Sequence, residues 1–118
     1  NYGIIHALDG YDEISLTSGF KFFTKNGEHI ITPEDLGQKR IQQSEIFGGN
    51  SVVDAAKIFK TILDGNGTEA QNSVVLTNTA FALTIVDSTK SFETAFEEAK
   101  SSLFGLKAKE CLSKLVTL

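Results

Sequence analysis

The sequence predicts an α/β protein of which these 118 residues form a part; taken alone, they predict an α+β unit. Three observations support this. Strand and hairpin patterns occupy roughly the first 30 residues, about four segments with helical periodicity follow, and apolar residues make up 41% of the chain. The composition is therefore sufficient for a packed core, and the strands precede the helices. The same order would also fit the last part of a larger α/β domain.

The first two extended segments are short. Residues 2–8 (YGIIHAL) predict a buried strand with Ile4 near its centre. Residues 13–19 (EISLTSG) alternate apolar and polar side chains, which would place Ile14 and Leu16 on one face of a second strand.

Residues 19–32 (GFKFFTKNGEHIIT) carry the strongest hairpin pattern. The Asn26-Gly27 pair predicts a type I′ turn, because both central residues of that turn need a positive φ. Alternation predicts one face of the hairpin: Phe20, Phe22 and, as a candidate partner, Ile30.

The next segment, residues 32–37 (TPEDLG), predicts a single helical turn. Thr32 can cap it, Pro33 suits its first position, and Gly37 can end it. Residues 38–50 then predict a loop.

Four helices are expected in the remaining chain, at residues 51–65, 68–87, 91–105 and 106–116. The second begins with Thr68 and Gln71 at the spacing of a capping box. It is apolar on most sides from Val74 to Val86, so we expect it to be the most buried helix. The fourth carries the only cysteine, Cys111, on an apolar stripe that predicts a packed thiol.

Composition bounds the possible functions. The net charge of −4 argues against a nucleic-acid partner, since such proteins usually present a basic face. No apolar run reaches the length of a membrane helix, so no membrane association is expected. A single cysteine is compatible with the reducing cytoplasm, where we expect the protein. Methionine is absent and the first strand begins almost at once, which favours a fragment of a longer protein.

Chemically informative residues cluster near the start of the chain, with His6, Asp9, Asp12 and Glu13 within eight positions. Asp12 and Glu13 are adjacent, and paired carboxylates suit Mg²⁺, which takes one or two carboxylates and completes its shell with water and phosphate oxygens. Zinc would need more nitrogen or sulfur ligands. The alternative is an ordinary polar turn containing Asp-Gly, with His6 as an interior histidine.

Five blocks occur in an order that resembles the anthranilate phosphoribosyltransferase family. They are IIHALDGYDEISL, TPEDLG, GGNSVVDAA, ILDGNGT and SVVLTNTAFAL. The family pattern runs V-V-H-G-x-D-G-L-D-E-I, P-E-D-[FL]-G, G-G-D-x-x-x-N-A, I-L-x-G and V-L-L-N-A-A-x-A-L. The resemblance covers nearly the whole chain and points to the C-terminal part of the catalytic α/β domain of the nucleoside phosphorylase/phosphoribosyltransferase fold.

The resemblance implies transfer of a phosphoribosyl group from phosphoribosyl pyrophosphate to the amine of anthranilate, in tryptophan biosynthesis. It implies Mg²⁺ bound by Asp12 and Glu13, with His6 as a candidate substrate-binding residue, and a homodimeric parent. The glycine-rich loop that holds pyrophosphate, the acceptor contacts and the N-terminal helical domain would lie upstream. We therefore expect the isolated chain to be inactive.

Departures from the family pattern occur at several positions. The glycine after the histidine is Ala7, the aspartate of G-G-D is Asn50, and the asparagine four residues later is Asp54. The last two look like an exchange that could keep a local hydrogen bond. Residues 77–80 read Thr-Asn-Thr-Ala in place of Leu-Asn-Ala-Ala.

Two further interpretations stay open at this point. One is a related phosphoribosyltransferase-like protein with another acceptor. The other is a non-catalytic binding or assembly domain of the same fold. A fragment would also expose a sheet edge and apolar surface near Ile4, Ile5 and residues 74–86, which predicts self-association.

Overall fold

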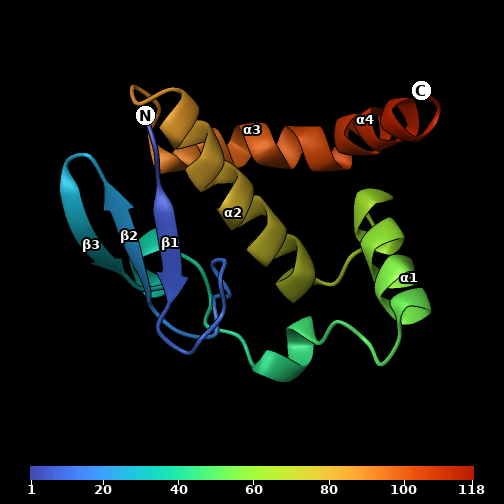
Figure 1. The fold of residues 1–118 in the computed structure, drawn as a ribbon, viewed down its shortest axis with the longest axis horizontal. Helices are drawn as coiled ribbons and strands as arrows, with labels where there is room; N and C mark the ends of the chain where they lie inside the picture. The colour runs from blue at the N-terminus through green and yellow to red at the C-terminus, as the bar shows by residue number, and fades with distance from the viewer.

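The computed structural model describes residues 1–118 and is an α+β unit, as the sequence predicts. Three antiparallel strands come first, in the spatial order β1-β2-β3, and four α-helices follow (Figure 1). The strands are β1 (Ile4–Ala7), β2 (Phe20–Thr24) and β3 (Gly27–Ile31). The helices are α1 (Val52–Leu63), α2 (Glu69–Val86), α3 (Phe92–Phe104) and α4 (Lys107–Val116). None of these helices combines the length and the apolar character needed to cross a membrane.

The sheet has one face toward the helices and one face toward solvent. Ala7 pairs with Phe20 and Phe20 with Ile31, and these three side chains pack on the inner face. The prediction that Ile30 shares a face with Phe20 and Phe22 is wrong. Ile30 pairs with Lys21 on the outer face and is 62% exposed. The expected burial of β1 holds fully only at Ala7: the strand is an edge, Ile4 is 58% exposed, and His6 is exposed as well.

The hairpin between β2 and β3 is confirmed, but its turn is not type I′. Thr24 pairs with Gly27, so the loop residues are Lys25 and Asn26. Among these four residues only Gly27 has a positive φ, of 121°. A type I′ turn would need a positive φ at both loop residues. The turn is therefore centred on Lys25 and Asn26, one residue earlier than the predicted Asn26-Gly27.

Residues 13–19 do not form a strand; they belong to an irregular loop between β1 and β2. Ile14 and Leu16 are fully buried, and Ser15 between them is buried as well, so the alternation does not describe two faces. Leu16 has a φ of 61°, which no regular strand contains. The segment is a buried loop because its polar groups find partners outside any sheet.

Two short 3₁₀ turns link the sheet to the helices. The first, η1 (Glu34–Leu36), is the predicted single turn, and Gly37 ends it with a φ of 66°. The second, η2 (Gln43–Ile46), lies in the expected loop and was not predicted. At its start the Gln42 N–H donates to the carboxylate of Glu45 at 2.7 Å, and the Glu45 N–H donates to Gln42 O at 3.0 Å.

Helix α2 crosses the middle of the molecule and is the most buried helix, as predicted. Its Phe81 ring contacts Phe20 and Phe22 of the sheet edge-on, at centroid distances of 5.3 and 5.0 Å. The same ring lies 5.4 Å from Phe92 at the start of α3. These aromatic contacts join sheet, α2 and α3 into one core.

Helix α3 buries its predicted stripe through Ala95, Ala99 and Leu103. Helix α4 continues from its end and has no buried residue. The prediction of a packed thiol is therefore wrong, since Cys111 is exposed. An ion pair of 2.7 Å between Lys109 and Asp64 is a direct link from α4 to the end of α1.

Helix α1 lies at the opposite end of the molecule from the sheet (Figure 1). It has no buried residue, although its sequence is amphipathic. Val52 and Val53 are 87% and 77% exposed. The total accessible surface is 7469 Å², about 1,200 Å² more than expected for a compact monomer of this mass. The excess is larger than one side of a standard protein interface, about 800 Å².

Candidate functional site

The candidate site lies in the loop between β1 and β2, residues 8–19, which we call the acidic loop. It begins with a tight turn in which the Gly10 N–H donates to Ala7 O at 3.1 Å and the Ala7 N–H donates to Tyr11 O at 3.1 Å. Gly10 has a φ of 99°, a conformation that side-chain-bearing residues rarely adopt. The loop closes where the Leu8 N–H donates to Gly19 O at 2.9 Å.

Asp9 holds the loop together and is occupied in doing so. Its carboxylate accepts hydrogen bonds from the hydroxyls of Thr17 and Ser18, the latter at 2.8 Å. Desolvation raises the pKa of Asp9, but the hydrogen bonds from Thr17 and Ser18, which favour the carboxylate, outweigh it and leave the pKa below its usual 3.8. Asp9 is thus a structural carboxylate of the loop.

Asp12 and Glu13 lie in the exposed part of the acidic loop. Neither carboxylate takes part in any hydrogen bond or ion pair within the chain, in contrast to Asp9. Two adjacent, exposed carboxylates with free oxygens match the donor set that Mg²⁺ takes from a protein when phosphate oxygens and waters complete its shell. No three metal-ligating side chains gather anywhere in the chain, so it offers this pair and not a closed protein cage.

His6 does not join the carboxylates in such a cluster. It lies on the outer face of β1, opposite Lys21 of β2, and it is exposed. The alternative of an interior histidine is therefore wrong. Its inward neighbours in the strand are Ile5 and Ala7, which pack against the core.

Asn78 of α2 is a residue of the site that sequence reasoning did not single out. Its side-chain amide bonds both main-chain groups of Ile14, next to Glu13. A signal was present, because Asn78 is a polar residue inside the apolar stretch of α2. What the sequence does not show is its partner, which lies 64 positions away.

A groove of about 520 Å³ begins beside the acidic loop and runs along η2. Its lining residues are Tyr11, Gln43, Ser44, Ile46, Phe47 and Gly48. Tyr11 directly precedes Asp12 in the chain, but neither Asp12 nor Glu13 lines the groove. It carries aromatic and amide groups but no charged side chain.

The start of α1, after the two glycines, is a simple helix entry. The Asp54 N–H donates to the hydroxyl of Ser51 at 3.1 Å, and the Asn50 N–H donates to the carboxylate of Asp54 at 3.3 Å. The local hydrogen bond expected between positions 50 and 54 is present, but the backbone of Asn50 makes it. Because Asp54 already places a negative charge at this helix end, the site is unfavourable for an anion.

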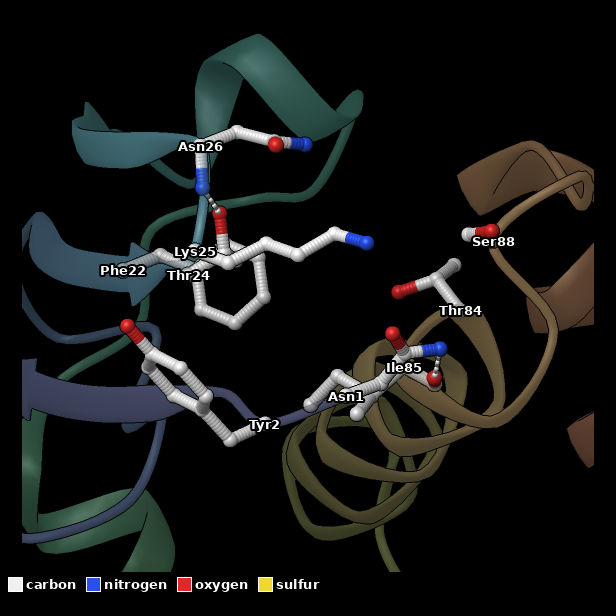
Figure 2. Close-up of a pocket in the computed structure, with 9 residues that line it drawn as sticks. All are labelled: Asn1, Tyr2, Phe22, Thr24, Lys25, Asn26, Thr84, Ile85 and Ser88. Atoms are coloured by element: carbon white, nitrogen blue, oxygen red, sulfur yellow. Dashed lines mark hydrogen bonds between the residues drawn. The ribbon is translucent and has the colours of Figure 1, made fainter.

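A second pocket, of about 180 Å³, lies at the other end of β1 (Figure 2). It is formed by the first residues of the chain, the β2–β3 turn and the end of α2. The Lys25 side chain extends toward Thr84 and Ser88 across this pocket, and the Asn1 amide donates to Ile85 O at 3.3 Å. None of the residues of the acidic loop lines it.

Comparisons with known proteins agree with this architecture. A family model described as "Glycosyl transferase family, a/b domain" matches residues 3–108. The chain is 47% identical over 117 residues to an anthranilate phosphoribosyltransferase of Bacteroides fragilis (strain YCH46), a match that covers 99% of this chain and 35% of that protein. The chain therefore spans about a third of the length of the curated relatives it matches.

Solved structures share the fold. The anthranilate phosphoribosyltransferase from Thermus thermophilus superposes with a TM-score of 0.80 at 22% identity, over 98% of this chain and 34% of that one. The enzyme from Saccharomyces cerevisiae in complex with PRPP and Mg gives a TM-score of 0.80 at 16% identity, over 94% of this chain and 32% of that one.

Proposed function

Because the chain belongs to the glycosyl transferase family whose a/b domain it matches, we propose that it is part of an anthranilate phosphoribosyltransferase. The reaction would move the phosphoribosyl group of phosphoribosyl pyrophosphate to the amine of anthranilate, a step of tryptophan biosynthesis. The similarity to the Bacteroides fragilis enzyme, 47% identical over nearly the whole chain, supports this assignment.

The chain would be the C-terminal portion of the catalytic domain. An N-terminal helical domain and the first part of the α/β domain would then lie in the rest of the polypeptide. The unusually large accessible surface and the bare apolar side of α1 support a larger parent domain. The isolated chain would be inactive, because the pyrophosphate cradle and the acceptor contacts would belong to the other part.

Asp12 and Glu13 would hold Mg²⁺ in this enzyme. The observation that carries the proposal is that these two adjacent carboxylates are exposed and have no partner within the chain, while the loop around them is fixed. The yeast relative of the same fold was solved with PRPP and Mg, which supports the choice of metal. Bound there, Mg²⁺ would neutralise the negative charge that accumulates on the departing pyrophosphate.

The remaining residues of the loop would keep that geometry. Asp9 ties the two ends of the acidic loop through Thr17 and Ser18, so the carboxylate pair need not become ordered when substrate binds. His6, exposed at the end of β1 just before this loop, would contact the substrate.

Partners and location complete the proposal. The parent would be a homodimer that acts in the cytoplasm, and the exposed thiol of Cys111 is compatible with a reducing compartment. The isolated chain would associate with a second copy of itself through the edge of β1 and its bare apolar surface. Ile4, at that edge, is 58% exposed, and Val53 and Phe59 of α1 are 77% and 52% exposed.

The proposal is tested in the full-length protein that contains this chain. We predict that Asp12→Asn combined with Glu13→Gln lowers product formation by roughly 100-fold or more. The melting temperature should change little, because both side chains are exposed and neither carboxylate forms a hydrogen bond or ion pair within the chain. Product is followed by the loss of anthranilate fluorescence at a series of Mg²⁺ concentrations.

The matched control neutralises another adjacent acidic pair, Glu97→Gln with Glu98→Gln. These side chains lie on α3 and form only surface ion pairs with lysines, so activity should be retained. Equal activity of the two double variants would refute the metal role of Asp12 and Glu13. Product formation with a different amine, and none with anthranilate, would refute anthranilate as the acceptor.

A further inference from the structure

One side chain of α2 binds the acidic loop through the loop's own backbone. The Asn78 Oδ1 accepts a hydrogen bond from the Ile14 N–H at 3.0 Å, and the Asn78 Nδ2 donates to Ile14 O at 2.8 Å. The same Nδ2 also donates to Val74 O, one turn back in the helix, at 2.9 Å. Asn78 therefore satisfies both main-chain groups of a single residue while its amide is oriented by its own helix.

Ile14 depends on this contact. It is fully buried and lies in a segment without strand pairing, so its main-chain groups have no backbone partner. Buried peptide groups without partners cost about 1–3 kcal/mol each. The amide of Asn78 takes the place that a neighbouring strand would have taken, and it fixes the peptide that joins Ile14 to Glu13.

The other side of the loop is fixed independently. Asp9, which precedes residues 10–13, accepts hydrogen bonds from the hydroxyls of Thr17 and Ser18. The two anchors lie on either side of residues 10–13. The carboxylates of this short segment are left free while its ends are held, which is the arrangement expected for ligands that are oriented before the metal arrives.

We propose that Asn78 is a positioning residue that orients the Asp12–Glu13 pair toward its metal by holding the peptide of Ile14. This inference rests on the proposed function, since it concerns the same pair. Loss of such outer contacts typically weakens metal affinity or activity by roughly 10- to 100-fold. Asn78 touches neither metal nor substrate in this account and acts only through the loop.

The test measures the binding of phosphoribosyl pyrophosphate to the full-length protein by calorimetry, at a series of Mg²⁺ concentrations. Asn78→Ala removes the contact. Asn72→Ala is the matched control, because Asn72 lies on the same helix, is partly buried and bonds Gly67 O at 3.0 Å, away from the loop. Asn78→Gln keeps a neutral amide with both donor and acceptor, displaced by one methylene, which guards against a failure of Asn78→Ala to fold.

Asn78→Ala should raise the Mg²⁺ concentration for half-maximal binding by about tenfold, and Asn78→Gln should raise it less. Asn72→Ala should leave this Mg²⁺ concentration unchanged, even if its melting temperature falls as much as that of Asn78→Ala. Amide exchange at Ile14 should accelerate in Asn78→Ala and not in Asn72→Ala.

Equal Mg²⁺ dependence of Asn78→Ala and Asn72→Ala would overturn the inference, because the role of Asn78 would then be structural only. The double variant Asp12→Asn with Glu13→Gln separates this failure from a failure of the proposed function. If that double variant also retains normal Mg²⁺ dependence, the metal pair itself is wrong. If only the double variant changes the Mg²⁺ dependence, Asp12 and Glu13 bind the metal and the positioning role of Asn78 is refuted.

Discussion

Thr77 is completely buried in the middle of α2, and its hydroxyl has no hydrogen-bond partner. A buried hydroxyl without a partner costs about 1–3 kcal/mol. We predict that Thr77→Val, which keeps the shape and removes the hydroxyl, raises the free energy of unfolding by roughly 1 kcal/mol. Urea unfolding of the purified protein measures this difference.

Thr79→Val is the control for that prediction. Thr79 is exposed, and its hydroxyl donates to Val75 O at 2.8 Å, so the exchange should stay within about 0.5 kcal/mol. A Thr77→Val protein less stable than the unsubstituted one would show that the buried hydroxyl has a partner after all.

Residue types alone singled out the acidic pair of the candidate site and not Asn78. Two adjacent acids after a strand suggested a metal pair, and the same pattern allowed a polar turn, so the resemblance to a family was needed to prefer one. The structural role of Asp9 could not be predicted from the sequence, because it depends on which hydroxyls reach its carboxylate: Thr17 and Ser18 bond Asp9 and leave Asp12 free.

At the scale of elements, α1 and β1 expose the apolar surface that a larger domain would cover. Val53 of α1 is 77% exposed and Ile4 at the edge of β1 is 58% exposed. We predict that the isolated chain self-associates through these surfaces, and that Val53→Lys and Ile4→Lys each shift sedimentation toward the monomer. Both sites are largely exposed, so the monomer should lose little stability.

Ser101→Lys, at an exposed position of α3 outside these surfaces, serves as the control and should leave association unchanged. Sedimentation as a monomer at the highest attainable concentration would contradict the prediction. Association that neither lysine variant weakens would place the contact on another surface.

The helices were predictable because their signals are local. The capping box of Thr68 and Gln71 forms as expected, and Ser51 caps α1 by accepting from the Asp54 N–H. Residues 13–19 were not predictable in this way. Their alternation is typical of a strand, but the backbone of Ile14 is satisfied by a side chain 64 positions away. A contact between residues so far apart in sequence produces no periodic pattern from which it could be predicted.

At the scale of the whole molecule, the structure combines a small core with a large accessible surface. The core cluster unites the inner face of the sheet, the buried part of the acidic loop and one side of α2. The carboxylate pair thus directly precedes Ile14, a residue of this core cluster, whereas α1 and α4 contain no buried residue. This division is expected if the site belongs to this chain and the bare helices complete their packing elsewhere.

The central claim is that this chain is the metal-bearing part of an anthranilate phosphoribosyltransferase. The most direct test replaces the matching third of the Bacteroides fragilis enzyme with these 118 residues and measures the Mg²⁺-dependent conversion of anthranilate and phosphoribosyl pyrophosphate. We predict that the chimera forms phosphoribosylanthranilate, and that the isolated chain forms none. A chimera that folds and assembles like the parent enzyme but makes no product would contradict the claim.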